Sequence, residues 1–124
     1  MSIRVLYVDD EDDIREVAAM SLELDPDFAV QTCASGEQAI AAAIASPPDV
    51  ILLDVMMPRL DGPETLALLQ TDPRTSRVPV IFITARTQAG DVKRLIGLGA
   101  IGHIAKPFDP LALAGQVRTL LETS

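Results

Sequence analysis

The chain has 124 residues, enough for one domain with a hydrophobic core, and 48% of its residues are hydrophobic but only 3% aromatic. Its formal net charge of −8 argues against direct binding to nucleic acid or to an anionic membrane and favours binding of cations. The single cysteine, Cys33, excludes an intrachain disulfide and suits a reducing cytoplasm. No stretch approaches the ~20 apolar residues of a membrane-spanning helix, and the N-terminus shows no apolar segment of a signal peptide. We therefore expect a cytoplasmic protein.

The first third of the chain predicts a strand, a helix and a second strand. Residues 3–8 are mostly apolar and partly β-branched, as a buried strand requires. Five consecutive acids follow, and they lead into a helix in which four apolar residues recur at roughly helical spacing: Ile14, Val17, Ala18 and Leu24. Residues 28–33 alternate between two faces, which is typical of a half-exposed edge strand.

The next segment predicts a helix and a fully buried strand. Ser35 and Gln38 have the form of a capping box, and an Ala-rich helix runs from there to about Ala45. Residues 50–53 are all apolar, which indicates a strand buried on both faces. This strand ends at Asp54, so an acid lies where the strand must emerge from the core.

The third helix and the fourth strand follow. Asp61 and Glu64 can cap the helix reciprocally. Residues 78–83 form the next apolar run, in which Pro79 is tolerable because it lies near the beginning. The run ends at Thr84.

The last third predicts two helices around a short strand. Residues 101–105 form this strand, which ends before Lys106. Asp109 and Pro110 supply an N-cap and a first-turn proline for the last helix. The preceding helix would have an inner face of four residues: Val92, Leu95, Ile96 and Gly99.

Five strands alternating with five helices predict a parallel sheet with helices on both faces. We find no linker, repeat or low-complexity tract, so residues 1–124 are expected to form one domain. Four of the predicted strands end in residues with charged or hydroxyl side chains that can bind ligands or react, and in a parallel sheet these ends lie at one edge. They are Asp9 and Asp10, Asp54, Thr84, and Lys106.

Three carboxylates at one edge repel each other and need a positive charge between them. At ~4 Å and an effective dielectric constant of ~20, each pair costs roughly 4 kcal/mol. Carboxylates are ligands that Mg²⁺ favours, and no His or Cys cluster indicates zinc. Lys106 adds a fixed positive charge and Thr84 a hydroxyl donor. A nucleophilic carboxylate at Asp54, with these groups around it, predicts a site that accepts a phosphoryl group.

At these residues the sequence resembles the receiver domain of two-component response regulators, and in size it resembles the single-domain chemotaxis regulator. The resemblance covers nearly the whole chain, and it implies a flavodoxin-like three-layer fold with strand order 2-1-3-4-5 and five helices. It rests on five segments in order: Val8-Asp9-Asp10, Leu53-Asp54-Val55-Met56-Met57-Pro58, Asp61-Gly62, Ile83-Thr84-Ala85 and Lys106-Pro107-Phe108.

The resemblance implies a signalling switch rather than a turnover enzyme. Asp54 would take a phosphoryl group from a sensor histidine kinase or a histidine phosphotransfer protein, and the domain would catalyse this reaction and a slow dephosphorylation. Asp10, Asp54 and the backbone carbonyl of Met56 would bind Mg²⁺, with help from Asp9.

The resemblance also implies the parts of a switch. Thr84 and Lys106 would hold the phosphoryl oxygens, and the peptide bond between Lys106 and Pro107 is expected to be cis. In the family an aromatic residue on the fifth strand follows the threonine when it moves. Here that position is His103, which makes the switch weaker or sensitive to pH, unless it is a plain surface histidine.

The resemblance also concerns the lifetime of the phosphorylated state and the face that contacts partner proteins. Met56 and Arg86 lie where the family tunes dephosphorylation, and neither is an acid or amide that positions water, so we expect no fast self-dephosphorylation. A downstream effector protein or a fused output domain would contact the face formed by the fifth strand and the last two helices. The same face could mediate dimerisation.

Two other functions remain open from the sequence. A Mg²⁺-dependent phosphohydrolase would also use an aspartyl phosphate, but such enzymes commonly carry a second acid where this chain has Met56. A receiver-like interaction module that no longer takes phosphate usually lacks one of the key groups, and all are present here. The chain could also be the N-terminal receiver of a longer regulator.

Overall fold

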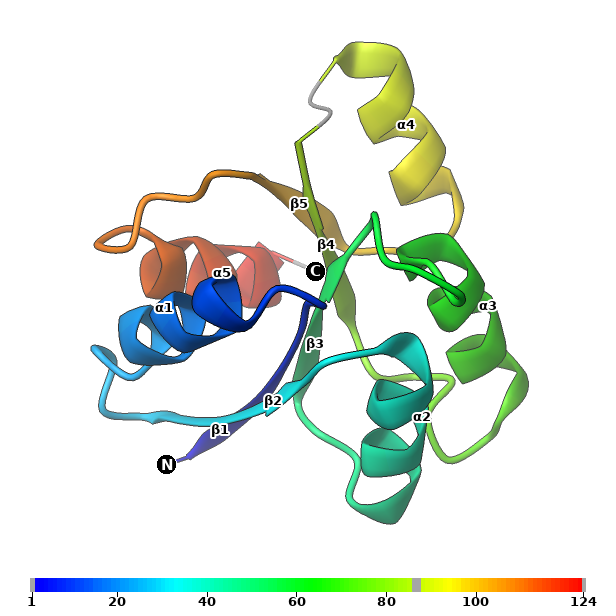
Figure 1. Ribbon diagram of the computed structural model, residues 1–124, viewed down its shortest axis with the longest axis horizontal. Coiled ribbons are helices and arrows are strands. Elements are labelled where there is room, and N and C mark those ends of the chain that lie inside the picture. Colours follow the sequence, from blue (N-terminus) through cyan, green and yellow to red (C-terminus); the bar gives the residue numbers. More distant parts are fainter. Residues whose placement is uncertain (1, 86–87, 124) are drawn as a thin grey trace.

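The computed structural model describes residues 2–85 and 88–123, in which five strands alternate with five helices (Figure 1). The strands are β1 Ile3–Val8, β2 Phe28–Cys33, β3 Val50–Asp54, β4 Val80–Thr84 and β5 Gly102–Ala105. The helices are α1 Asp12–Leu22, α2 Gly36–Ala45, α3 Gly62–Thr71, α4 Ala89–Gly97 and α5 Leu113–Thr123. Within the described residues, no helix is long and apolar enough to cross a membrane.

The strands form one parallel sheet in the order β2-β1-β3-β4-β5, which confirms the predicted flavodoxin-like arrangement. β2 forms one edge of the sheet, as its alternating pattern predicts, and β5 forms the other. Val8 pairs with Leu53, so Asp9 and Asp54 lie at the ends of neighbouring strands. Thr84 pairs with Ala105, which brings the end of β4 beside Lys106.

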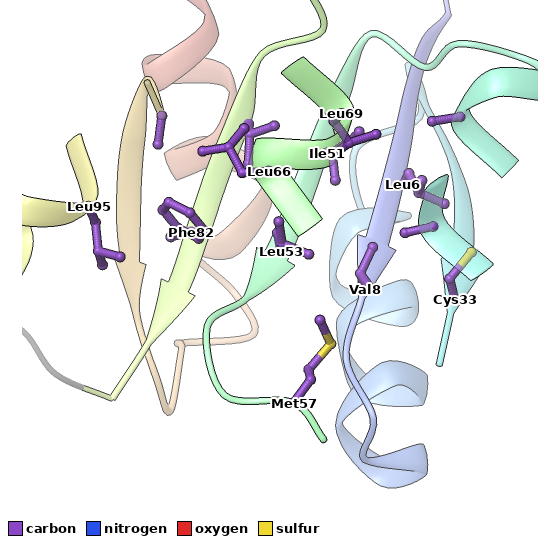
Figure 2. Close-up of a cluster of buried hydrophobic side chains, with 14 residues drawn as sticks. Leu6, Val8, Cys33, Ile51, Leu53, Met57, Leu66, Leu69, Phe82 and Leu95 are labelled. Atoms are coloured by element: carbon purple, nitrogen blue, oxygen red, sulfur yellow. The ribbon is translucent and has the colours of Figure 1, made fainter. Parts of the chain in front are cut away.

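Helices cover both faces of the sheet because successive strand residues point to opposite sides. Figure 1 shows α1 and α5 on one face and α2, α3 and α4 on the other. Two buried clusters separate these layers, and Figure 2 shows the one beneath α2, α3 and α4, where Leu53 and Phe82 meet Leu66. β1, β3 and β4 supply side chains to both clusters, which explains their nearly continuous apolar sequences.

The predicted helix N-termini are confirmed for α3 and only half confirmed for α2. Asp61 accepts a hydrogen bond from the N–H of Glu64 at 2.8 Å, and Glu64 accepts one from the N–H of Asp61 at 3.1 Å. Ser35 likewise accepts from the N–H of Gln38 at 3.1 Å. The side chain of Gln38, however, accepts from the N–H of Ala34 at 2.8 Å instead of that of Ser35.

The apolar pattern predicted for α1 and the inner face predicted for α4 are partly wrong. α1 ends at Leu22, so Leu24 lies outside the helix, and both Val17 and Leu24 are exposed. On α4, Leu95 is buried but Ile96 is exposed. These helices therefore contact the sheet through narrower faces than their apolar residues suggest.

Gly99 was also predicted on the inner face of α4, and it lies beyond the end of that helix. Its φ of 112° is a left-handed conformation that residues with a Cβ rarely adopt, and a Cβ there would meet the side chain of Gln70. The glycine therefore makes the turn that leaves α4, and it carries no packing surface.

Three element boundaries differ from the prediction. β4 begins at Val80 rather than two residues earlier, although the carbonyl of Pro79 accepts a hydrogen bond from the N–H of Ile51 at 3.0 Å. β5 begins at Gly102, one residue late. α5 begins at Leu113, because Asp109 first forms a turn in which its side chain accepts a hydrogen bond from the N–H of Leu111 at 2.9 Å.

Candidate functional site

The site lies at the carboxyl ends of the central strands. Asp9 and Asp10 follow β1, Asp54 is the last residue of β3, and Lys106 follows β5. Asp9 is completely buried and Asp54 is 3% exposed, whereas Asp10 is exposed. The parallel register thus brings together residues that are up to 97 positions apart, as the strand-end pattern predicts.

The three aspartates form a cluster with the chemistry of a metal site. Each of Asp9, Asp10 and Asp54 offers a carboxylate oxygen, and these oxygens all lie within 4.8 Å of one another. Hard oxygen donors of this kind fit Mg²⁺. Met56 lies beside the cluster, where its N–H donates to Oδ1 of Asp54 at 3.4 Å. The role of the Met56 carbonyl as a ligand stays a prediction.

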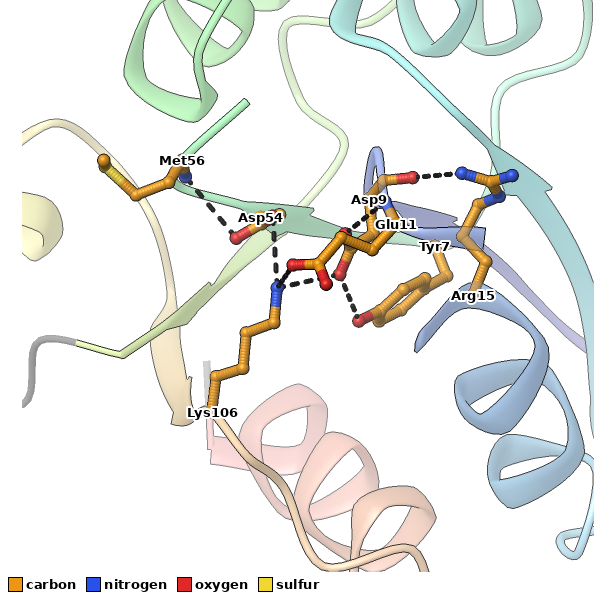
Figure 3. Close-up of polar contacts among 7 residues, drawn as sticks. All are labelled: Tyr7, Asp9, Glu11, Arg15, Asp54, Met56 and Lys106. Carbon is orange, nitrogen blue, oxygen red and sulfur yellow. Dashed lines mark hydrogen bonds and ion pairs between the residues drawn. The ribbon is translucent and has the colours of Figure 1, made fainter. Parts of the chain in front are cut away.

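Lys106 supplies the positive charge that the acids require (Figure 3). Its Nζ lies 3.1 Å from Oδ2 of Asp9, 3.3 Å from Oδ2 of Asp54 and 3.6 Å from Oε1 of Glu11. The peptide bond between Lys106 and Pro107 is cis, as the resemblance implies. The ammonium group therefore bridges two buried carboxylates that would otherwise repel each other.

Burial and the neighbouring charges shift the pKa values of Asp54 and Lys106. Burial raises the pKa of Asp54, the neighbouring Asp9 raises it further, and Lys106 opposes both, which leaves the pKa at about 6. Partial burial lowers the pKa of Lys106, but the carboxylates of Asp9 and Asp54 outweigh it and leave that pKa raised. At neutral pH Asp54 is thus mostly an anion, held next to a protonated lysine.

Asp9 is held by contacts that the sequence did not indicate. Its Oδ2 accepts from the hydroxyl of Tyr7 at 3.1 Å, and its Oδ1 accepts from the N–H of Glu11 at 3.0 Å. Arg15 donates to the backbone carbonyl of Asp9 at 2.7 Å. Of these residues, only Tyr7 carried a usable signal, because residues two apart on a strand share a face.

Gly62 provides the space in which the end of β3 lies. A Cβ at this position would lie 2.6 Å from the carbonyl oxygen of Asp54 and 2.8 Å from Cα of Val55. The N–H of Gly62 donates to the carbonyl of Val55 at 3.0 Å. The first turn of α3 therefore supports the backbone of Asp54 directly, which only glycine permits at this distance.

The other predicted site residues lie nearby or at the sheet edge. Thr84 is buried at the end of β4, and its carbonyl accepts from the N–H of Lys106 at 2.9 Å. Met56 exposes 69% of its surface. His103 is half-buried on the edge strand β5, where it pairs with Phe82. Arg86 lies outside the described residues.

The fold and the site define a parallel α/β domain that presents a cluster of aspartates and a lysine at the carboxyl ends of its strands. Residues 5–118 match the family model of the response regulator receiver domain. The chain therefore belongs to the receiver domain family of two-component response regulators, whose members act in signal transduction.

Individual relatives agree with this assignment. The chain is 40% identical over 117 residues to the transcriptional regulatory protein CseB of Streptomyces avermitilis, covering 94% of this chain and 48% of CseB. It is 40% identical over 122 residues to the response regulator PleD of Caulobacter vibrioides, covering 97% of this chain and 26% of PleD. The chain thus spans half or less of the length of these relatives.

A solved structure of similar size also matches. The chemotaxis response regulator CheY4 of Vibrio cholerae superposes with a TM-score of 0.89 at 30% identity, covering 97% of this chain and 99% of that one. The likeness therefore extends over the whole α/β domain and includes all five strands.

Proposed function

We propose that residues 1–124 form a receiver domain that acts as the phosphoacceptor switch of a two-component phosphorelay, with Asp54 as the acceptor. The observation that carries this proposal is the pair of contacts from Lys106 Nζ to Asp9 and Asp54, at 3.1 and 3.3 Å, beside the exposed Asp10. Phosphoryl transfer requires a carboxylate nucleophile, a fixed cation and oxygen ligands for a divalent metal, and these residues offer all three.

Asp54 would act as the nucleophile toward a phosphohistidine of a sensor kinase or a phosphotransfer protein. One carboxylate oxygen attacks phosphorus, a P–O bond forms, and the P–N bond breaks. The electron pair of that bond goes to the imidazole, which then takes up a proton. Lys106 would balance the charge of the phosphoryl oxygens, and the hydroxyl of Thr84 would donate a hydrogen bond to them.

Mg²⁺ is the proposed cofactor. The oxygen donors of Asp10 and Asp54 would bind it with the carbonyl of Met56, and Asp9 would assist. When bound, the ion neutralises the acids and polarises the phosphoryl group. The close approach of the three carboxylates, within 4.8 Å of one another, supports this assignment.

The signal would leave the domain through β5 and the last two helices. Thr84 would move toward the phosphoryl group, and His103 would follow it as the aromatic residue does in the family. A downstream effector protein or an output domain fused to the chain would read this face, and the same face would serve any dimer. The acidic domain itself would contact neither nucleic acid nor membrane, and it would act in the cytoplasm.

The phosphorylated state is expected to be long-lived. Met56 and Arg86 lie at the positions that tune dephosphorylation in the family, and neither supplies an acid or an amide to position water. Dephosphorylation followed by intact mass spectrometry should give a half-life of minutes or longer. A half-life of seconds would contradict this expectation.

The direct test is intact mass spectrometry after incubation with acetyl phosphate and Mg²⁺. Wild type and Asp91→Asn, a control outside the site, should each gain one phosphoryl group, and Asp54→Asn should gain none. Omission of Mg²⁺ should abolish the adduct. An adduct that persists in Asp54→Asn would contradict the assignment of the acceptor.

The same sample separates the alternative functions. Sustained release of phosphate from a small phosphomonoester would indicate a phosphohydrolase instead of a switch. If acetyl phosphate gives no adduct and beryllofluoride with Mg²⁺ leaves the NMR spectrum unchanged, the domain is a phosphate-independent interaction module.

A further inference from the structure

Tyr7 is a buried polar residue that the phosphoacceptor chemistry leaves unused. It is the single tyrosine of a chain that has no tryptophan, and its side chain, on the next-to-last residue of β1, is completely buried. A phenol is protonated at neutral pH, so the hydroxyl of Tyr7 can donate a hydrogen bond. Its hydroxyl donates to Oδ2 of Asp9 at 3.1 Å, as Figure 3 shows.

Tyr7 donates to the same carboxylate oxygen that Lys106 contacts. Oδ2 of Asp9 accepts from Tyr7 and from Nζ of Lys106, both at 3.1 Å, while Oδ1 accepts from the N–H of Glu11 at 3.0 Å. Three donors from three different segments thus hold one carboxylate. Of the three, Tyr7 is the one whose position is fixed by packing on all sides, because its ring belongs to the core beneath α1 and α5.

Tyr7 also contacts the loop that carries Lys106. Its ring meets the ring of Phe108 edge to face, with centroids 6.4 Å apart and planes at 71°. Phe108 follows Lys106 by two residues, across the cis peptide bond. One rigid aromatic side chain therefore contacts both an acid of the cluster and the loop of its counter-charge.

We propose that Tyr7 is a positioning residue whose hydroxyl fixes the carboxylate of Asp9 in the orientation that the metal-binding cluster requires. This inference rests on the proposed function, because it assigns Asp9 to a cation site. Groups that hydrogen-bond to metal-binding side chains orient them, and their loss typically weakens metal affinity by about 10- to 100-fold. Without the hydroxyl, Asp9 would have to be ordered when the cation binds.

The test compares the Mg²⁺ affinity of wild type and Tyr7→Phe by isothermal titration calorimetry. This substitution keeps the ring and its contact with Phe108, and it leaves Asp9 with two donors. Thr75→Val is the matched control, because it removes a buried hydroxyl that donates to the carbonyl of Leu69 at 2.7 Å, at the opposite end of the sheet. A merely structural role for Tyr7 predicts equal Mg²⁺ affinities in both variants.

We expect the dissociation constant of Tyr7→Phe to rise at least about tenfold and that of Thr75→Val to stay at the wild-type value. In phosphorylation by acetyl phosphate, Tyr7→Phe should need correspondingly more Mg²⁺ for half-maximal rate, while saturating Mg²⁺ restores the wild-type rate. In wild type, Mg²⁺ should also change the tyrosine emission, which comes from Tyr7 alone.

The outcomes separate this inference from the proposed function. If wild type is phosphorylated at Asp54 but Tyr7→Phe binds Mg²⁺ as tightly as wild type, the positioning role is refuted and the switch stands. If wild type binds Mg²⁺ more tightly than Tyr7→Phe but accepts no phosphoryl group, the positioning role stands and the switch is refuted. Failure of wild type to bind Mg²⁺ refutes the positioning role, since there is then no cation for Asp9 to meet.

Discussion

The charge of Asp54 should destabilise the metal-free protein, and its removal should therefore be stabilising. Asp54 is 3% exposed and lies beside the buried Asp9, with Lys106 as the neighbouring cation. Its pKa is raised from 3.8 to about 6, first by burial and then by Asp9, despite the opposing effect of Lys106. The folded protein thus binds a proton at Asp54 more tightly than the unfolded chain does.

The sign and size of the effect follow from this difference. A group with a raised pKa in the folded state favours folding when it is protonated, so stability falls as pH rises from about 4 to about 6. Above both values the ionised carboxylate costs about 3 kcal/mol. Asp54→Asn removes that charge, and at pH 8 it should stabilise the protein by up to about 3 kcal/mol, or roughly 10 °C in melting temperature.

The assay is urea unfolding of wild type and Asp54→Asn in EDTA, from pH 4 to pH 8. The gain in the free energy of unfolding should be largest at pH 8 and should shrink toward zero at pH 4. Glu16→Gln, an exposed site on α1, changes the net charge equally and should show no such pH dependence. Equal stability of the two proteins at pH 8, or a gain that persists at pH 4, would refute the reasoning.

Two further substitutions probe the contacts around Asp54. Lys106→Met leaves two buried carboxylates without their cation and should lower the free energy of unfolding in EDTA by about 3 kcal/mol, measured with urea; unchanged stability would mean that the lysine is not needed there. Gly62→Ala forces a Cβ against the backbone of Asp54 and Val55 and should cost about 1–3 kcal/mol and slow phosphorylation. Gly115→Ala, where the added Cβ would meet nothing within 4 Å beyond its chain neighbours and the backbone of its own helix, should instead stabilise α5 by about 0.5–1 kcal/mol. A loss as large as that at Gly62 would count against the clash.

The central strands were predictable because a strand that is buried on both faces needs a nearly continuous run of apolar residues. The predicted bounds of β1 and β3 agree with the structure to the residue. β4 begins two residues later than predicted, since Pro79 lacks the N–H that a ladder requires. The helix faces were less predictable. Val17 and Ile96 fit the apolar period of their helices yet lie outside the contact with the sheet, because the period does not reveal how wide that contact is.

The site was predictable to the level of which residues meet. The carboxyl ends of parallel strands share an edge, and this alone brought Asp9, Asp54 and Lys106 together. The orientation of each side chain was not predictable, because it depends on rotamers and on donors from other segments. The hydroxyl of Tyr7 and the N–H of Glu11 reach Asp9 only once the turn after β1 has its final form.

If the site takes a cation and a phosphoryl group as proposed, its balance of charge predicts the order in which they bind. Three clustered carboxylates face one ammonium group, so Asp9, Asp10, Asp54 and Lys106 together carry two more negative than positive charges. A phosphoryl donor is itself an anion and would be repelled by this surplus. A divalent cation would offset this surplus, and although the nearby carboxylate of Glu11 remains, the donor would then meet much less repulsion. Cation binding should therefore precede phosphoryl transfer, and the orientation of Asp9 would act on the first of these steps.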